Sequence, residues 1–290
     1  MILSVSRRCD IPRFSFDWFL ERLEAGFVEV KNPFNPRQIR QVCLLPPSPE
    51  RPPGESVEVL AFWTRDPANI LNYSESLEGR GYRFFVMTSL TSYPALLEPN
   101  VPPTEAVIET MVKLARKTSP ERVIWRYDPV FLSDKTGYES HRRNFADLAG
   151  RLEGSVKRVI VSVYDEYPGA ERRLSALEQK GCLTRFPHYA VDPQGKRSLL
   201  SEFRGLLSEL ASIAHGKGME MQSCAEEDLS DAGIKSGACI DGEYMASQFG
   251  ISIPGRDRGQ GRKGCLCVQS VDIGTYGRCP AGCVYCYGLR

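Results

Sequence analysis

Residues 57–67 read VEVLAFWTRDP, an apolar run followed by a few polar residues and then a proline. Apolar runs of this length are typical of strands that are buried on both faces of a parallel sheet. Proline has no N–H to donate to a strand ladder, so it fits just beyond the end of a strand. The stretch therefore predicts a buried parallel strand whose C-terminal end carries polar side chains.

The same pattern recurs along the chain, and helical patterns alternate with it. Further apolar runs lie at 1–6 (MILSVS), 82–87 (YRFFVM), 121–125 (ERVIW), 156–163 (VKRVIVSV) and 219–224 (MEMQSC). Helical spacing of apolar residues predicts helices over 15–26, capped by Ser15, over 104–114, capped by Thr104, and over 138–152, 169–179 and 197–214. Strands that alternate with helices favour an α/β fold with a parallel sheet, either a (β/α) barrel or partial TIM-like barrel, or an open doubly wound sheet. No G-x-G-x-x-G follows the first run, which argues against a dinucleotide site there.

Composition narrows the class of protein. The chain has 290 residues, 42% of them hydrophobic and 25% charged, and a formal net charge of +1. This charge predicts no nucleic-acid partner held by bulk electrostatics. The first residues hold no signal-peptide pattern, and no stretch approaches the roughly 20 apolar residues that span a membrane. We therefore expect a cytoplasmic protein without a membrane partner.

Seven of the ten cysteines fall in the last quarter of the chain. Disulfides are rare in a reducing compartment, so clustered cysteines favour metal binding or catalysis. Helical periodicity also fades after about residue 225. The sequence therefore predicts a (β/α) barrel over 1–224 and a cysteine-rich, metal-organised segment over 225–290 that packs on the mouth of the barrel.

The segment Cys279-Pro280-Ala281-Gly282-Cys283-Val284-Tyr285-Cys286-Tyr287 carries three cysteines at spacings of four and three. A single loop can direct all three thiolates at one small inorganic core. A closed iron–sulfur or zinc site takes four ligands. Either a fourth ligand comes from elsewhere, or one metal position is open for chemistry. Zinc sites commonly use paired C-x-x-C units, so this spacing favours an iron cubane over zinc.

The loop resembles the cluster loop of radical S-adenosylmethionine (SAM) enzymes, and Tyr276 through Tyr287 is similar to their Y-x-x-C-x-x-G-C-x-Y-C-Y form. The resemblance implies a [4Fe–4S] cluster on Cys279, Cys283 and Cys286, with SAM bound at its open iron. In those enzymes the loop follows the first barrel strand, whereas here it ends the chain. A short strand over 270–276 placed beside strand 1–6 would make the fold a circular permutation of theirs. The whole chain also resembles a bacterial family of unknown function that has a cysteine-rich C-terminal motif.

The other cysteines of the last quarter are Cys224, Cys239, Cys265 and Cys267. Together they supply four ligands, the number for a second, auxiliary [4Fe–4S] cluster or for a structural zinc. Alternatively, one of these four cysteines is the fourth ligand of the site formed by Cys279, Cys283 and Cys286.

Polar residues recur where the predicted strands end. In parallel barrels the functional groups gather at this end of the sheet. The candidate catalytic residues are Arg8, Asp10, Arg65, Asp66, Arg126, Asp128, Asp165 and Glu226. Arginine pairs well with carboxylates, including that of SAM, so Arg126, Asp128 and Tyr285 are the candidate cofactor contacts. The alternative is that these charges pair with one another and only stiffen the rim.

Three functions follow, from different classes. The first is a radical SAM-like enzyme that acts on a small-molecule substrate and takes electrons from a donor protein. The second is an iron–sulfur barrel enzyme that uses its open iron as a Lewis acid or redox centre without SAM. The third is a binding module stabilised by zinc or a cluster. The sequence does not identify the substrate.

Overall fold

The computed structural model describes residues 1–33, 35, 37–51, 54–226, 228–251, 264–277 and 279–289. Pro52 and Pro53 of a proline-rich loop, part of the predicted cysteine-rich segment and Arg278 of the loop motif lie outside these residues. The main sheet has eight strands, and every pairing between them is parallel. In spatial order the strands are β11 (Lys235–Gly237), β10 (Glu220–Cys224), β7 (Arg158–Val163), β6 (Val123–Val130), β5 (Phe84–Ser89), β4 (Val59–Thr64), β1 (Ile2–Val5) and β12 (Val271–Asp272).

All six apolar runs form strands of this sheet, so the prediction of buried parallel strands is confirmed. The rule that proline follows the strand is wrong for β6, which continues through Pro129. The register between β6 and β7 shifts between Tyr127 and Val130. A local irregularity of this kind admits a residue that cannot donate to the ladder.

The strand predicted over 270–276 is present as only two residues, and it lies beside β1 as expected, with Leu3 opposite Val271. Seven strands therefore follow one another in chain order, and the eighth lies next to the first. A closed barrel also needs β11 to pair with β12, and the described residues show no such pairing. The structure thus shows an α/β fold with a parallel sheet.

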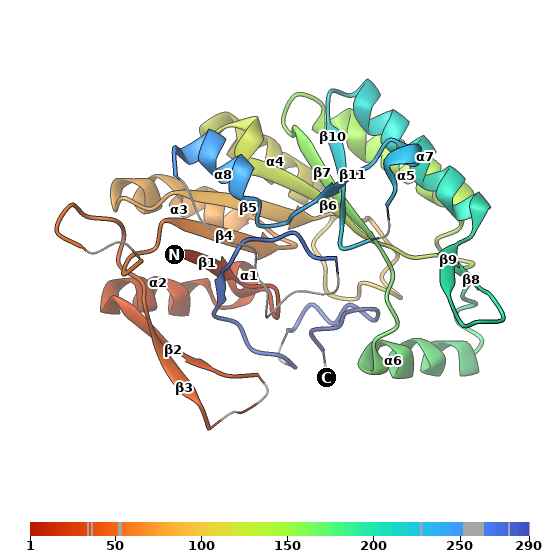
Figure 1. Cartoon of the computed structure of the whole chain (residues 1–290), viewed down its shortest axis with the longest axis horizontal. Helices are drawn as coiled ribbons and strands as arrows, with labels where there is room; N and C mark the ends of the chain where they lie inside the picture. The colour runs from red at the N-terminus through yellow and green to blue at the C-terminus, as the bar shows by residue number, and fades with distance from the viewer. Residues whose placement is uncertain are drawn as a thin grey trace.

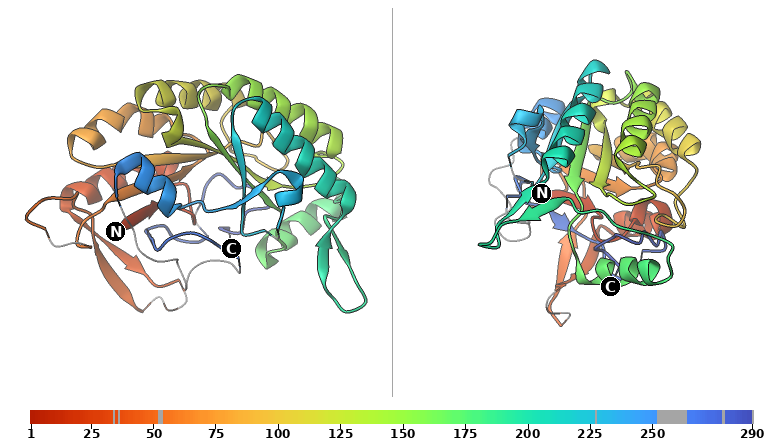
Figure 2. Two further views of the ribbon diagram at one scale, coloured as in Figure 1. Left: turned by 45° about the horizontal axis from the view of Figure 1, so that its top comes forward. Right: turned by 90° about the vertical axis from the view of Figure 1, so that its right-hand side faces the viewer.

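Helices follow most strands, and most of them pack an apolar face on the sheet, whereas α6 packs against the C-terminal cysteine loop. They are α1 (Ile11–Phe14), α2 (Phe16–Ala25), α3 (Ala68–Gly79), α4 (Thr104–Lys117), α5 (Tyr138–Leu152), α6 (Pro168–Gln179), α7 (Ser201–Gly216) and α8 (Gly242–Phe249). Two predicted boundaries are wrong. Thr104 is the first residue of α4 rather than its cap, which is Pro103, and Leu199 ends a short strand before α7. Figures 1 and 2 show α3, α4, α5 and α7 arched over one face of the sheet.

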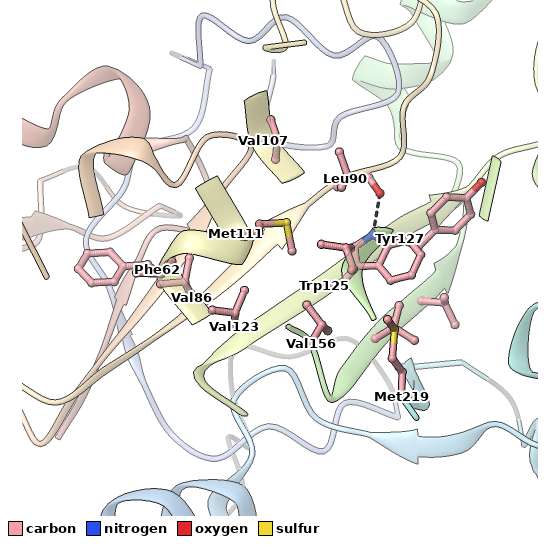
Figure 3. Close-up of a cluster of buried hydrophobic side chains, with 14 of the residues drawn as sticks. Phe62, Val86, Leu90, Val107, Met111, Val123, Trp125, Tyr127, Val156 and Met219 are labelled. Carbon is pink, nitrogen blue, oxygen red and sulfur yellow. Dashed lines mark hydrogen bonds between the residues drawn. The ribbon is translucent and has the colours of Figure 1, made fainter. Parts of the chain in front are cut away.

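Alternate side chains of the strands form two cores. On the helix-covered face, Phe62, Val86, Val123 and Trp125 are fully buried, and the Trp125 indole donates to the Leu90 carbonyl at 2.8 Å (Figure 3). On the opposite face a second cluster joins residues of β1, β4, β5, β6 and β7 to α8 and to the segment around Val268. The second cluster covers only part of that face, and the rest is left to the candidate site.

Two antiparallel hairpins flank the sheet, β2 (Phe27–Lys31) with β3 (Ile39–Cys43), and β8 (Tyr189–Val191) with β9 (Arg197–Leu199). The C-terminal segment runs between the first hairpin and α6 (Figure 1). No described helix is both long and apolar enough to cross a membrane.

Candidate functional site

On the inner face of the sheet, which is the face opposite α3, α4, α5 and α7, side chains change from apolar to polar toward the C-terminal ends of the strands. Alternate residues of a strand share one face, so every second residue contributes to this change. The successive inner residues are Phe85, Met87 and Ser89 on β5, Ile124, Arg126 and Asp128 on β6, and Ile160 and Ser162 on β7. The apolar members belong to the second core, and the polar ones line a cavity.

The cavity has a volume of about 930 Å³ and lies at this end of the sheet. Sites for small molecules and cofactors are commonly about 300–1,000 Å³ in volume. The seven cysteines of the predicted metal sites line it: Cys224, Cys239, Cys265, Cys267, Cys279, Cys283 and Cys286. Six of the eight predicted rim residues also line it: Arg8, Asp10, Arg65, Arg126, Asp128 and Asp165.

Asp66 and Glu226 are not among the described residues that line the cavity. Asp66 turns toward α3, where its carboxylate accepts the N–H of Ala68 at 3.1 Å. The carboxylate of Glu226 accepts the N–H of Val163 at 3.0 Å. Both side chains satisfy backbone donors near strand ends, so their geometry fits a structural role better than the predicted catalytic one.

The loop cysteines, Cys279, Cys283 and Cys286, are held against the sheet by Tyr285. Tyr285 is buried, and its hydroxyl hydrogen-bonds to Arg65 and to Glu98. Arg65 also forms an ion pair with Glu98, at 2.8 Å. Arg65 and Glu98 are themselves buried, so the loop is anchored by a buried charged network at the cavity wall.

Main-chain groups of the loop are satisfied by more distant residues. The guanidinium of Arg173 on α6 donates to the carbonyls of Val284 and Leu289, at 2.9 and 3.0 Å. The N–H of Val284 donates to the carbonyl of Leu97 at 2.9 Å. The loop therefore has a fixed path between α6 and the segment after β5.

The loop thiols lie in a buried setting with nearby N–H donors. Burial raises the pKa of Cys283 to about 12, and the neighbouring Cys286 and Cys279 contribute to this shift. Burial also raises the pKa of Cys279, although backbone hydrogen bonds from Asp10 and Ala281 act in the opposite direction. The N–H of Gly288 donates to Cys286 Sγ at 3.2 Å. N–H donors of this kind stabilise thiolate ligands of iron–sulfur clusters and tune their potentials.

The other four cysteines that line the cavity, Cys224, Cys239, Cys265 and Cys267, are called the seam cysteines here. Cys224 and Cys239 have their sulfurs 3.1 Å apart. Hydrogen bonding to Cys224 and Cys267 lowers the pKa of Cys239, and hydrogen bonding to Cys239 and Cys265 raises the pKa of Cys267. The four thiols thus form a row of interactions, and their assignment to one metal site stays a prediction.

Arg126 connects the seam cysteines to the polar rim. Its guanidinium donates to Cys239 Sγ at 2.9 Å, forms an ion pair with Asp128, and lies 4.6 Å from the ring centroid of Trp63. The Asp128 carboxylate also accepts from the hydroxyl of Ser162. Trp63 lines the cavity, and its indole N–H has no partner among the described residues. This N–H is a donor that the sequence analysis did not identify.

The N-terminal strand and β12 are joined by a buried carboxylate that was also missed. Asp272 accepts from the hydroxyls of Ser4 and Ser6 at 2.8 and 2.7 Å, and from the N–H groups of Arg7 and Gly274. Near it, Asp10 accepts from the Thr64 hydroxyl and the Arg65 N–H, and burial raises its pKa to about 6. The predicted rim residue Asp10 therefore also has a structural task.

As the side chains stand, no three or more His, Cys, Asp or Glu residues in the described part of the chain are placed to hold a metal ion. His141 and His188 are buried and bonded within the fold. His141 hydrogen-bonds to Tyr127 and Phe131, and His188 accepts the N–H of Leu132.

Together these features define an α/β protein whose parallel sheet bears a large, cysteine-lined cavity at the C-terminal ends of its strands. The chain belongs to the family described as "Domain of unknown function (DUF1848)", whose model matches residues 2–288. This confirms the resemblance of the whole chain to a family of unknown function, whereas the resemblance to radical SAM enzymes stays a prediction. No curated protein matches the chain.

Proposed function

We propose that this protein is an iron–sulfur enzyme of the radical SAM-like type, in which Cys279, Cys283 and Cys286 hold a [4Fe–4S] cluster at the cavity wall. The observation that carries the proposal is that all three thiols line one cavity together with charged residues from the strand ends. Three thiolates leave one iron open, which is the arrangement that the spacing predicts.

The residues present fit such a group. Cys286 Sγ accepts the N–H of Gly288, and the buried guanidinium of Arg65 opposes the rise that burial causes in the pKa of Cys283. When bound, the cluster would supply one electron, received from the donor protein, to the sulfonium of SAM, and cleavage of its carbon–sulfur bond would give methionine and a 5′-deoxyadenosyl radical. The Tyr285 anchor would keep the ligands at the wall, and the apolar inner core below would exclude water from the bottom of the cavity.

The strand order supports a finer description of the fold. We infer a partial (β/α) barrel, circularly permuted relative to radical SAM barrels, because β12 leads into the cysteine loop and lies beside β1. Arg126 and Asp128 remain the proposed cofactor contacts, although they are bound to each other. We also propose that the enzyme acts on a small-molecule substrate, receives electrons from a donor protein and works in the reducing cytoplasm.

The test uses the full chain, purified and reconstituted without oxygen. We expect iron and acid-labile sulfide, an electron paramagnetic resonance signal that SAM perturbs, and 5′-deoxyadenosine after reduction. Cys283→Ser should lose the loop iron, whereas Cys43→Ser, on β3 and outside the cavity lining, should keep it.

Two other results would replace the proposal. An intact cluster that gives no 5′-deoxyadenosine and a signal unchanged by SAM would indicate a Lewis-acid or redox iron–sulfur protein. A colourless chain that carries zinc in the loop would indicate a metal-stabilised binding module.

A further inference from the structure

The seam cysteines lie where the sheet would have to close. Cys224 ends β10, and Cys239 follows β11 by two residues. Cys265 and Cys267 belong to the segment that leads to β12. The N–H of Val268 donates to the carbonyl of Ile240 at 3.0 Å, so this segment runs against the residues that follow β11.

Separate packing of four unrelated cysteines does not explain this arrangement. A lone buried cysteine behaves as a small apolar side chain and needs no partner. Here the sulfurs of Cys224 and Cys239 are 3.1 Å apart, and Cys267 interacts with both Cys239 and Cys265. The row also receives donors: Arg126 to Cys239 at 2.9 Å, and the N–H of Ile240 to Cys267 Sγ at 3.4 Å. Both donors favour negative charge on sulfur, which is the form that binds metals.

A disulfide is not what the structure contains. All ten cysteines are free, and the closest seam sulfurs are 3.1 Å apart, whereas a disulfide bond is about 2.05 Å long. Two thiolates on one tetrahedral zinc ion, with Zn–S of about 2.3 Å, are separated by about 3.8 Å. The sulfurs of Cys224 and Cys239 would therefore have to move apart by less than about 1 Å to bind one ion.

We propose that Cys224, Cys239, Cys265 and Cys267 form a second metal site, which binds a single zinc ion through four thiolates. A cubane with four irons would hold its ligands farther apart than these contacting sulfurs. Four protein ligands leave no open position, so the site is structural. It cross-links β10 and the residues after β11 to the segment before β12, where the described residues show no strand pairing. This proposal does not depend on the proposed function.

The experiment separates the two cysteine groups. The full chain is prepared with Cys279→Ser, Cys283→Ser and Cys286→Ser together, stripped of metal under reducing conditions, and titrated with Co²⁺ as the probe. We expect one Co²⁺ per chain, with sulfur-to-cobalt charge-transfer bands and the ligand-field bands of a tetrahedral site, and displacement of cobalt by zinc. Adding Cys265→Ser and Cys267→Ser should abolish these bands, whereas adding Cys43→Ser should not change them.

A second readout covers the case in which this multiple variant does not fold. In the wild-type chain, zinc should protect the four seam cysteines from alkylation, as mapped by mass spectrometry of peptides, and leave Cys43 and Cys182 reactive. The proposal is overturned if zinc protects none of the four, or if cobalt bands survive without Cys265 and Cys267. It is equally overturned if anaerobic reconstitution of the loop variant deposits about four irons with sulfide at the seam, since this is a cubane. Loss of radical chemistry in the wild-type chain would leave the zinc result unchanged.

Discussion

The loop cysteines and the seam cysteines line one cavity but are organised in different ways. The loop thiols are close in the sequence and are positioned by their surroundings: N–H donors, the Arg173 contacts and the Tyr285 anchor. The seam thiols come from separate segments and touch one another directly. The positions of the loop thiols therefore depend on the residues that surround them. The positions of the seam thiols depend on strand ends that converge and on the ligand that their sulfurs bind. The predictions below use this contrast, because each change should disturb the loop and spare the seam.

The largest effect is expected from Glu98→Gln. Arg65 is buried and paired with Glu98, and removing one partner of a buried ion pair costs about 3–5 kcal/mol because a charge is left uncompensated. The free energy of unfolding, from denaturant titration, should fall by this amount. Alkylation of the loop cysteines in the folded protein should rise, while that of the seam cysteines stays low.

Glu109→Gln is the matched control, because Glu109 pairs with Lys113 on the exposed face of α4. Exposed pairs of this spacing contribute little because solvent and salt screen them, so the control should unfold almost as the wild type does. Equal losses in the two variants would show that the anchor at Tyr285 is not a buried charge network.

A smaller effect is expected from acid. Burial lowers the pKa of His141 and of His188 to about 4. His141 Nε2 donates to the Phe131 carbonyl and Nδ1 accepts from Tyr127, and the Phe131 ring stacks on Tyr285 at 6.4 Å between centroids. Above about pH 6.5 both histidines are neutral in the folded and unfolded chains, so they do not affect stability. Between 6.5 and 4 only the unfolded chain takes up the protons, so stability falls with falling pH, and the loss is complete below about 4.

Between pH 7 and pH 5 the expected loss from His141 is about 2 kcal/mol, because stability falls by about 1.36 kcal/mol per pH unit below the unfolded pKa of about 6.5. Urea titrations at pH 7 and pH 5 measure it. His141→Gln cannot gain this proton, so its stability should depend less steeply on pH than that of the wild type. If the stability of His141→Gln depends on pH as steeply as that of the wild type, protonation of His141 does not cause the loss of stability in acid. Loop cysteines should become reactive on acidification before the seam cysteines do.

Much of the fold could be predicted because buried parallel strands leave a local signal. Each apolar run became a strand, and the last strand lies beside β1, the place that the resemblance to radical SAM barrels implied for it. The loop spacing was also local. Glu98 was missed because it lies in a loop after β5, where no pattern marks it, and Asp272 because its strand has only two residues. Asp66 looked like Asp10 in the sequence, but tertiary packing places them differently. Asp10 caps α1 by accepting the Arg13 N–H and also lines the cavity, whereas Asp66 turns toward Ala68 and does not line it.

The smallest effect is expected at the turn inside the loop. Gly282 has φ +68°, in the left-handed region, and a Cβ there would lie 3.3 Å from Pro99 Cγ. Gly282→Ala should therefore cost about 1–2 kcal/mol in the free energy of unfolding. Gly154→Ala is the matched control, because Gly154 has φ +77° and nothing within 4 Å of the added Cβ. Both variants should lose similar stability, but only Gly282→Ala should raise the alkylation rate of Cys279 and Cys283 in the folded chain. The same rates in both variants would mean that the turn does not set the direction of these thiols. The loop thiols would then not be positioned by their own turn, which would contradict the difference drawn between the loop and the seam.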